Sequence, residues 1–157
     1  MVVRTIKLKK LLVYLVATFL FGVIGTLLGG GTGQIYSSIN KPPLSPPSIV
    51  FPIVWSILYL LMGISAYFLS NERNANTSVL LKLYWIQLAL NALWPLFFWR
   101  FKVYYFAAVI IVAILSLVAW ITVKAFKINK LSAYFLLPYV VWLLFALYLN
   151  IGVAVLN

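Results

Sequence analysis

Long apolar runs separated by short polar or basic segments dominate the chain. Each run has about the 20 residues that a helix needs to cross a ~30 Å hydrocarbon core. The pattern therefore predicts one membrane domain, an all-α bundle of five transmembrane helices at about residues 11–28, 49–69, 79–99, 104–123 and 132–155. The first run follows a basic tail, as in a secretory signal peptide, but it exceeds the roughly 7 to 15 apolar residues typical of one.

The most polar connection is the segment 29–48, between the first two runs. Glycines at its start are expected to end the first helix, and Lys41-Pro42-Pro43 and Pro46-Pro47 then predict a stiff, proline-rich hairpin. The next helix carries Trp55, Tyr59 and Tyr67. A stiff lid beside an aromatic membrane helix predicts a ligand pocket beneath the lid.

The other connections are shorter. A polar turn is expected at residues 71–74, and the basic segment 124–130 is expected to separate the last two helices. Pro95 and Pro138 lie inside predicted spans and should kink them, because proline leaves a carbonyl of the preceding turn without its donor.

Composition agrees with this membrane assignment. The chain is 66% hydrophobic and 8% charged, with a mean hydropathy of +1.11, whereas the surface of a soluble protein is about a quarter charged. It has no cysteine, no histidine and one acid, Glu72. These absences exclude disulfides, imidazole general-base catalysis and ordinary zinc or iron ligation, so no metal or cofactor is predicted.

The 12 basic residues against one acid give a net charge of +11. Because they cluster at the ends of the spans, they indicate contact with anionic lipid head groups and not with nucleic acid. Nine lie on one side of the predicted bundle (residues 4, 7, 9, 10, 73, 82, 124, 127 and 130) and three on the other (41, 100 and 102). The positive-inside rule then predicts an N-terminus in the cytoplasm and a C-terminus outside, and the basic tail fits a bacterial plasma membrane.

Polar side chains inside the spans are costly in lipid unless they face a partner or a cavity. Gln87 and Asn91 share one face of the third span, and Trp94 follows at the next turn. Two interpretations stay open. These amides either form hydrogen bonds between helices, or they make a polar floor under an aromatic pocket.

The aromatic residues fall into two groups. Those near span ends are typical of the membrane interface: Trp85, Trp99, Tyr104, Tyr105 and Trp120. A second group can line a pocket for a planar, apolar guest, because Trp142 and Ala146 place a flat surface and a gap on one helix face: Trp55, Tyr59, Trp94, Tyr139 and Trp142. Gly25 and Gly29 make a GxxxG spacing, which we interpret as helix packing.

Three collinear motifs across about residues 34–150 resemble the TspO/MBR family of tryptophan-rich sensory proteins, which includes the translocator proteins known as peripheral benzodiazepine receptors. The residues that carry the resemblance are Tyr36, Lys41-Pro42, Pro46-Pro47, Val54-Trp55, Leu58-Tyr59, Met62-Gly63, Gln87-Leu88-Ala89-Leu90-Asn91, Trp94-Pro95, Pro138-Tyr139, Trp142, Phe145 and Asn150. The resemblance implies a five-helix bundle, often a homodimer, whose cavity opens toward the first long loop.

The resemblance also implies that this cavity binds porphyrins, such as protoporphyrin IX and haem-related tetrapyrroles, and isoquinoline-type or benzodiazepine-type drugs. The implied contacts are Tyr36, Pro46, Trp55, Tyr59, Asn91, Trp94, Trp142 and Ala146. We add Lys41, which is placed either to meet porphyrin propionates at the mouth or to cap the loop.

The chain departs from the family pattern at several positions. Ile35 and Leu44 stand where relatives commonly have tryptophan, and Ile110 replaces a membrane acid. The chain ends without the tyrosine and following basic residue of the vertebrate cholesterol motif, so no cholesterol partner is predicted.

Three functions remain in view. The first is a receptor or carrier for porphyrins. The second is an enzyme that degrades porphyrin with light and oxygen, for which Trp55 and Trp142 would be the catalytic candidates. The third is a passive or coupled transporter of small apolar molecules, although proton coupling usually relies on an intramembrane acid or histidine.

Overall fold

The structure is a computed structural model that describes residues 6–30 and 32–157. The described residues form helices and connecting segments, without a strand. The helices are α1 (Leu8–Gly29), α2 (Thr32–Ser38), α3 (Val50–Ser70), α4 (Thr77–Pro95), the π-helical segment η1 (Leu96–Arg100), α5 (Tyr104–Ile128) and α6 (Lys130–Leu156). Among these residues, five helical spans are long and apolar enough to cross a membrane, with α4 and η1 forming one of them. The chain is an all-α integral membrane protein.

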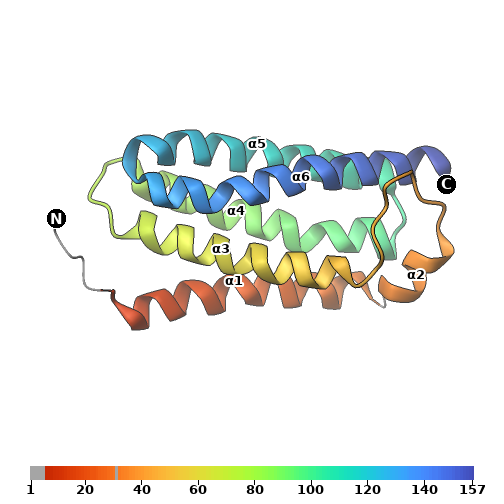
Figure 1. The fold of residues 1–157 in the computed structure, drawn as a ribbon, viewed down its shortest axis with the longest axis horizontal. Helices are drawn as coiled ribbons and strands as arrows, with labels where there is room; N and C mark the ends of the chain where they lie inside the picture. Colours follow the sequence, from red (N-terminus) through yellow and green to blue (C-terminus); the bar gives the residue numbers. More distant parts are fainter. Residues whose placement is uncertain (1–5, 31) are drawn as a thin grey trace.

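The five spans run side by side along the length of the molecule (Figure 1). The turns joining α3 to α4 and α5 to α6 lie at the end where α1 begins, while α2 and the C-terminus lie at the opposite end. The main core is built from α3, α4, α5 and α6 around residues such as Met62, Leu88, Ile114 and Tyr139. Helix α1 packs along the outside of this core.

Small residues let α1 approach its neighbours. Its buried residues are Thr18, Gly25 and Gly29. A Cβ on Gly25 would lie 3.3 Å from the backbone of Ala92, and one on Gly29 would lie 2.9 Å from Cβ of Pro95. The GxxxG spacing therefore serves packing within this bundle, as predicted, and is not a free face for a second copy.

Helix α5 and helix α6 almost touch end to end, which corrects the expected break at residues 124–130. Helix α5 continues to Ile128, and Asn129 is the single residue between the two helices. The Asn129 Oδ1 accepts a hydrogen bond from the Ser132 amide, and its Nδ2 donates to Glu72 at 2.8 Å. Lysine is a good helix former, so the lysines mark where the lipid ends and not where the helix ends.

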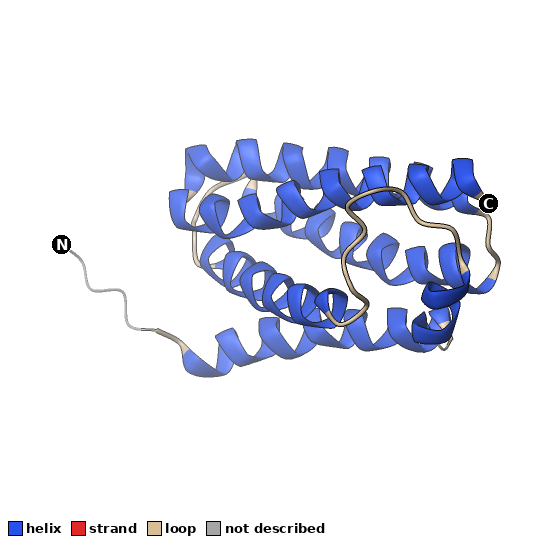
Figure 2. Ribbon diagram, turned by 45° about the vertical axis from the view of Figure 1, so that its right-hand side comes forward, coloured by secondary structure: helices blue, strands red, loops and turns tan. Residues whose placement is uncertain are grey.

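The expected hairpin at 29–48 also contains a helix that was not predicted, α2. Its sequence, TGQIYSS, is short, polar and rich in weak helix formers. After α2 the chain crosses over one end of the bundle before α3 begins (Figure 2). The segment therefore covers that end of the bundle, where the lid was expected.

Pro95 ends the regular α-helix of the third span. It lacks the amide hydrogen for the Asn91 carbonyl, and the backbone widens into η1, where the Phe101 amide donates to the Leu96 carbonyl at 3.0 Å. Phe98 and Trp99 on this segment are buried, 4% and 8% exposed. The interfacial assignment of Trp99 was therefore wrong, because the widened turn directs the indole inward.

Candidate functional site

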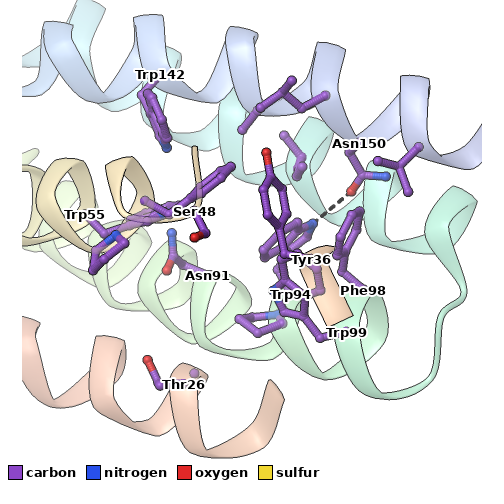
Figure 3. Close-up of a pocket in the computed structure, with 18 of the residues that line it drawn as sticks. Thr26, Tyr36, Ser48, Trp55, Asn91, Trp94, Phe98, Trp99, Trp142 and Asn150 are labelled. Carbon is purple, nitrogen blue, oxygen red and sulfur yellow. Dashed lines mark hydrogen bonds between the residues drawn. The ribbon is translucent and has the colours of Figure 1, made fainter. Parts of the chain in front are cut away.

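A cavity of about 470 Å³ lies inside the loop-covered end of the bundle. This volume falls within the range of about 300–1,000 Å³ that is usual for small-molecule sites. All five spans and the segment that covers this end of the bundle (residues 32–49, the covering segment) contribute side chains to it (Figure 3).

The structure brings together nearly all of the predicted site residues. The cavity lining includes Tyr36, Lys41, Trp55, Tyr59, Asn91, Trp94, Trp142 and Ala146. Pro46 is the exception, since it is not part of the lining and instead accepts a hydrogen bond through its carbonyl from the Tyr36 hydroxyl. Its role in the structure is to hold Tyr36 in place.

Aromatic rings form the walls. On α3, the Trp55 and Tyr59 rings lie 5.5 Å apart, and on the opposite side Trp94 stacks on Phe98 at 4.7 Å. Phe51 meets Trp142 edge-on at 6.1 Å. Sequence reasoning missed Phe51, Phe98 and Trp99 as lining residues, because an aromatic residue near a span end looks the same whether it faces lipid or a cavity.

The indole groups of Trp94 and Trp142 differ in their hydrogen bonding. Trp94 Nε1 donates to Asn150 Oδ1 at 3.0 Å, and Asn150 in turn donates to the Tyr104 carbonyl. Trp142 Nε1 is buried and has no partner among the described residues. A buried donor without a partner costs about 1–3 kcal/mol of free energy. A ligand that accepts a hydrogen bond from this atom would remove that cost.

Polar groups from three helices form the floor. The Tyr59 hydroxyl donates to Asn91 Oδ1 at 2.8 Å, and Asn91 Nδ2 donates to the Tyr139 hydroxyl at 2.8 Å. The Tyr139 hydroxyl donates onward to Gln87 Oε1 at 3.0 Å. Both interpretations of the amides therefore hold in part: Gln87 and Asn91 join helices, and Asn91 also faces the cavity.

Lys41 and Tyr36 form the roof. Lys41 Nζ donates to the carbonyls of Tyr36 and Ile39, at 2.9 and 3.1 Å, and lies 4.9 Å from the centre of the Tyr36 ring. Lys41 thus caps the loop, one of its two predicted roles, and its ammonium also borders the cavity. Burial raises the pKa of the Tyr36 phenol, so this group stays a neutral hydrogen-bond donor at physiological pH.

A set of contacts fastens the covering segment to the end of α6. The Asn40 amide donates to Asn157 Oδ1 at 2.9 Å, and Asn157 Nδ2 donates to the Asn40 carbonyl at 2.8 Å. The Tyr148 hydroxyl donates to the Pro43 carbonyl at 2.7 Å. Pro42 packs directly on Gly152, where a Cβ would collide with the proline ring. We call these contacts the α6 latch.

The cavity combines flat apolar walls with a hydrogen-bonding floor and a cationic roof. The family model of the TspO/MBR family matches residues 12–156. The chain belongs to the TspO/MBR family. The match extends beyond the motif-bearing region at both ends and includes Tyr148 and Gly152 of the α6 latch, but not Asn157.

Named relatives of this TspO/MBR chain come from bacteria, archaea and mammals. It is 36% identical over 148 residues to protein CrtK of Rhodobacter capsulatus, covering 92% of this chain and 91% of the relative. It is 30% identical to the tryptophan-rich protein TspO of Archaeoglobus fulgidus, covering 94% and 97%. It is 34% identical over 131 residues to the human translocator protein, covering 81% and 78%. The similarity thus extends over most of each chain.

Proposed function

We propose that this protein is a membrane receptor or carrier that binds porphyrins, and isoquinoline-type or benzodiazepine-type molecules, in the cavity under residues 32–49. The observation that supports this most directly is the arrangement of the lining, with aromatic walls running from the Asn91 floor to the Lys41 roof. A planar molecule with one polar edge has the complementary shape and polarity.

The walls suit the faces of a tetrapyrrole. A macrocycle lying against Trp55 and Trp142 would exchange lipid or water contact for aromatic stacking. At ~25 cal/mol per Å² of apolar surface, burial of one macrocycle face contributes several kcal/mol. The walls alone therefore provide useful affinity without specific hydrogen bonds.

The polar groups would set the orientation of the guest. Propionates at the roof would pair with the Lys41 ammonium in place of its present carbonyl partners, since a charge-assisted bond is stronger than a neutral one. At the wall, Trp142 Nε1 would donate to an acceptor on the edge of a guest, such as a carbonyl of a drug. In the predicted topology this roof faces the outside of the cell.

Titration with protoporphyrin IX, followed by porphyrin absorbance in detergent, tests the proposal. We expect the Trp55→Ala, Trp142→Ala double variant to bind at least about tenfold more weakly, because two walls are lost. Trp120→Ala is the matched control, because Trp120 is exposed on α5 and does not line the cavity. Unchanged affinity in the double variant would show that the ligand binds elsewhere.

The same samples separate a binding protein from a light-dependent enzyme. A receptor or carrier leaves the Soret band of bound porphyrin no less stable under illumination than that of porphyrin in detergent. Faster loss that disappears in the Trp55→Ala, Trp142→Ala variant would instead favour the degrading enzyme.

A further inference from the structure

The outer face between α3 and α6 carries an apolar groove. It is lined by Val54, Ile57, Leu58, Tyr134, Leu137, Pro138, Val141, Trp142 and Phe145. Ile57 and Val141 are 52% and 65% exposed and lie on membrane-spanning helices, so the groove faces lipid. Among the described residues, Trp142 is the one side chain that borders both this groove and the inner cavity.

Trp142 is held in place by packing alone. Its rings contact Phe51 edge-on and Phe145 at 5.6 Å, while its Nε1 has no hydrogen-bond partner among the residues described. Trp94, by contrast, is fixed through Asn150. Figure 3 shows the Trp142 indole projecting from α6 toward the cavity. Turning this side chain would break no hydrogen bond.

The backbone beside Trp142 is also weakened. Pro138 lies one turn earlier on α6 and borders the groove. Because proline has no amide hydrogen, the carbonyl of Tyr134 lacks its partner within the helix. Local bending of α6 at this turn is therefore less costly than elsewhere in the helix.

The covering segment is fastened more firmly. Lifting it would break the Asn40–Asn157 pair of hydrogen bonds and the Tyr148–Pro43 bond, which join it to α6. Moving Trp142 would break only ring contacts. A molecule already dissolved in the bilayer thus meets less resistance at the groove than at the loop.

We propose that the α3–α6 groove is a transit site through which planar apolar molecules pass from the bilayer into the cavity, with Trp142 as the wall that moves. This inference rests on the proposed ligand binding and adds the route. The ligand class is the same, namely flat molecules that partition into lipid before they bind.

Filling the groove tests the route. Val141→Trp places an indole in the groove at a residue that does not line the cavity. Porphyrin supplied in phosphatidylcholine vesicles is mixed with protein in nanodiscs, and absorbance gives the association and dissociation rates. We expect both rates to fall about tenfold with an unchanged Kd, since an obstructed path alters kinetics and not equilibrium.

Val109→Trp is the matched control, because Val109 is 62% exposed on α5 and borders neither the groove nor the cavity. Ile57→Trp fills the groove from α3 and serves as a second variant should Val141→Trp fold poorly. Unchanged rates in a folded groove variant, or equal slowing in Val109→Trp, would overturn the route. Failure of the unmodified protein to bind porphyrin would instead refute the proposed function.

Discussion

At the residue scale, Asn91 shows how one buried amide joins structure to a ligand site. It accepts from Tyr59 on α3, donates to Tyr139 on α6, and still faces the cavity from α4. In lipid no water replaces a lost partner, so all members of such a network depend on one another. The floor of the cavity is therefore also a junction of three helices.

Replacing Asn91 with leucine should leave the Tyr59 and Tyr139 hydroxyls short of partners. We expect a loss of roughly 1–3 kcal/mol in the free energy of unfolding. Equilibrium unfolding in mixed micelles measures this, with Asn76→Leu as the control, because Asn76 is exposed and makes no side-chain cap. Equal losses of unfolding free energy in the two variants would mean that the hydrogen bonds of Asn91 do not stabilise the fold.

At the scale of elements, the covering segment depends on the last turns of α6. Gly152 allows Pro42 to pack on the helix backbone, while Tyr148 and Asn157 bond to the segment on either side of that contact. The absence of a Cβ at Gly152 is thus a requirement of docking. The same helix carries Trp142, so α6 supports both the roof and one wall.

Gly152→Val should undock this segment without unfolding the bundle, because overpacking at an edge costs about 1–3 kcal/mol and is relieved by moving Pro42. Limited subtilisin digestion should then cut near Leu44, which is 82% exposed. Ile151→Val, at an exposed neighbour on the same helix, is the control. If Gly152→Val resisted subtilisin as well as the unmodified protein does, the α6 latch would not be what holds the covering segment in place.

At the scale of the whole molecule, charge is distributed between the two ends of the bundle. Lys10 and Lys130 lie in the first turns of α1 and α6, Lys82 lies in the second turn of α4, and Lys127 lies in the last turn of α5, all at the end that holds the α3–α4 and α5–α6 turns. At the loop-covered end, Lys41 lies in the covering segment and Arg100 ends η1. This asymmetry is the basis of the predicted orientation with the cavity roof outside.

The chain has no cysteine, so single introduced thiols report the topology cleanly. In intact cells, a membrane-impermeant maleimide should label Leu44→Cys, whereas Ala75→Cys in the α3–α4 turn should react only after lysis. Both sites are exposed, so access to the reagent depends on the side of the membrane. The reverse pattern would invert the orientation and place the roof in the cytoplasm.

The sequence by itself determined the number of spans, because the length of an apolar run is set by membrane thickness. Helical spacing also placed Trp55 with Tyr59 and Asn91 with Trp94, since residues about one turn apart share a helix face. It did not show α2, since seven polar residues carry no periodic signal. It also ended the fourth span at about Val123, whereas α5 continues to Ile128. A run of lysines shows where the chain meets solvent, but it does not end a helical backbone.

Only the tertiary structure decided which aromatic residues face the cavity and which hold the cover. Trp99 and Trp120 have the same side chain and similar places near span ends, yet one lines the cavity and the other is exposed. The difference arises from the widened turn after Pro95 and from which neighbours pack there. Trp142 borders both the groove and the cavity, and Gly152 contacts Pro42. Both arrangements likewise depend on how segments far apart in the sequence pack together, which local sequence does not encode.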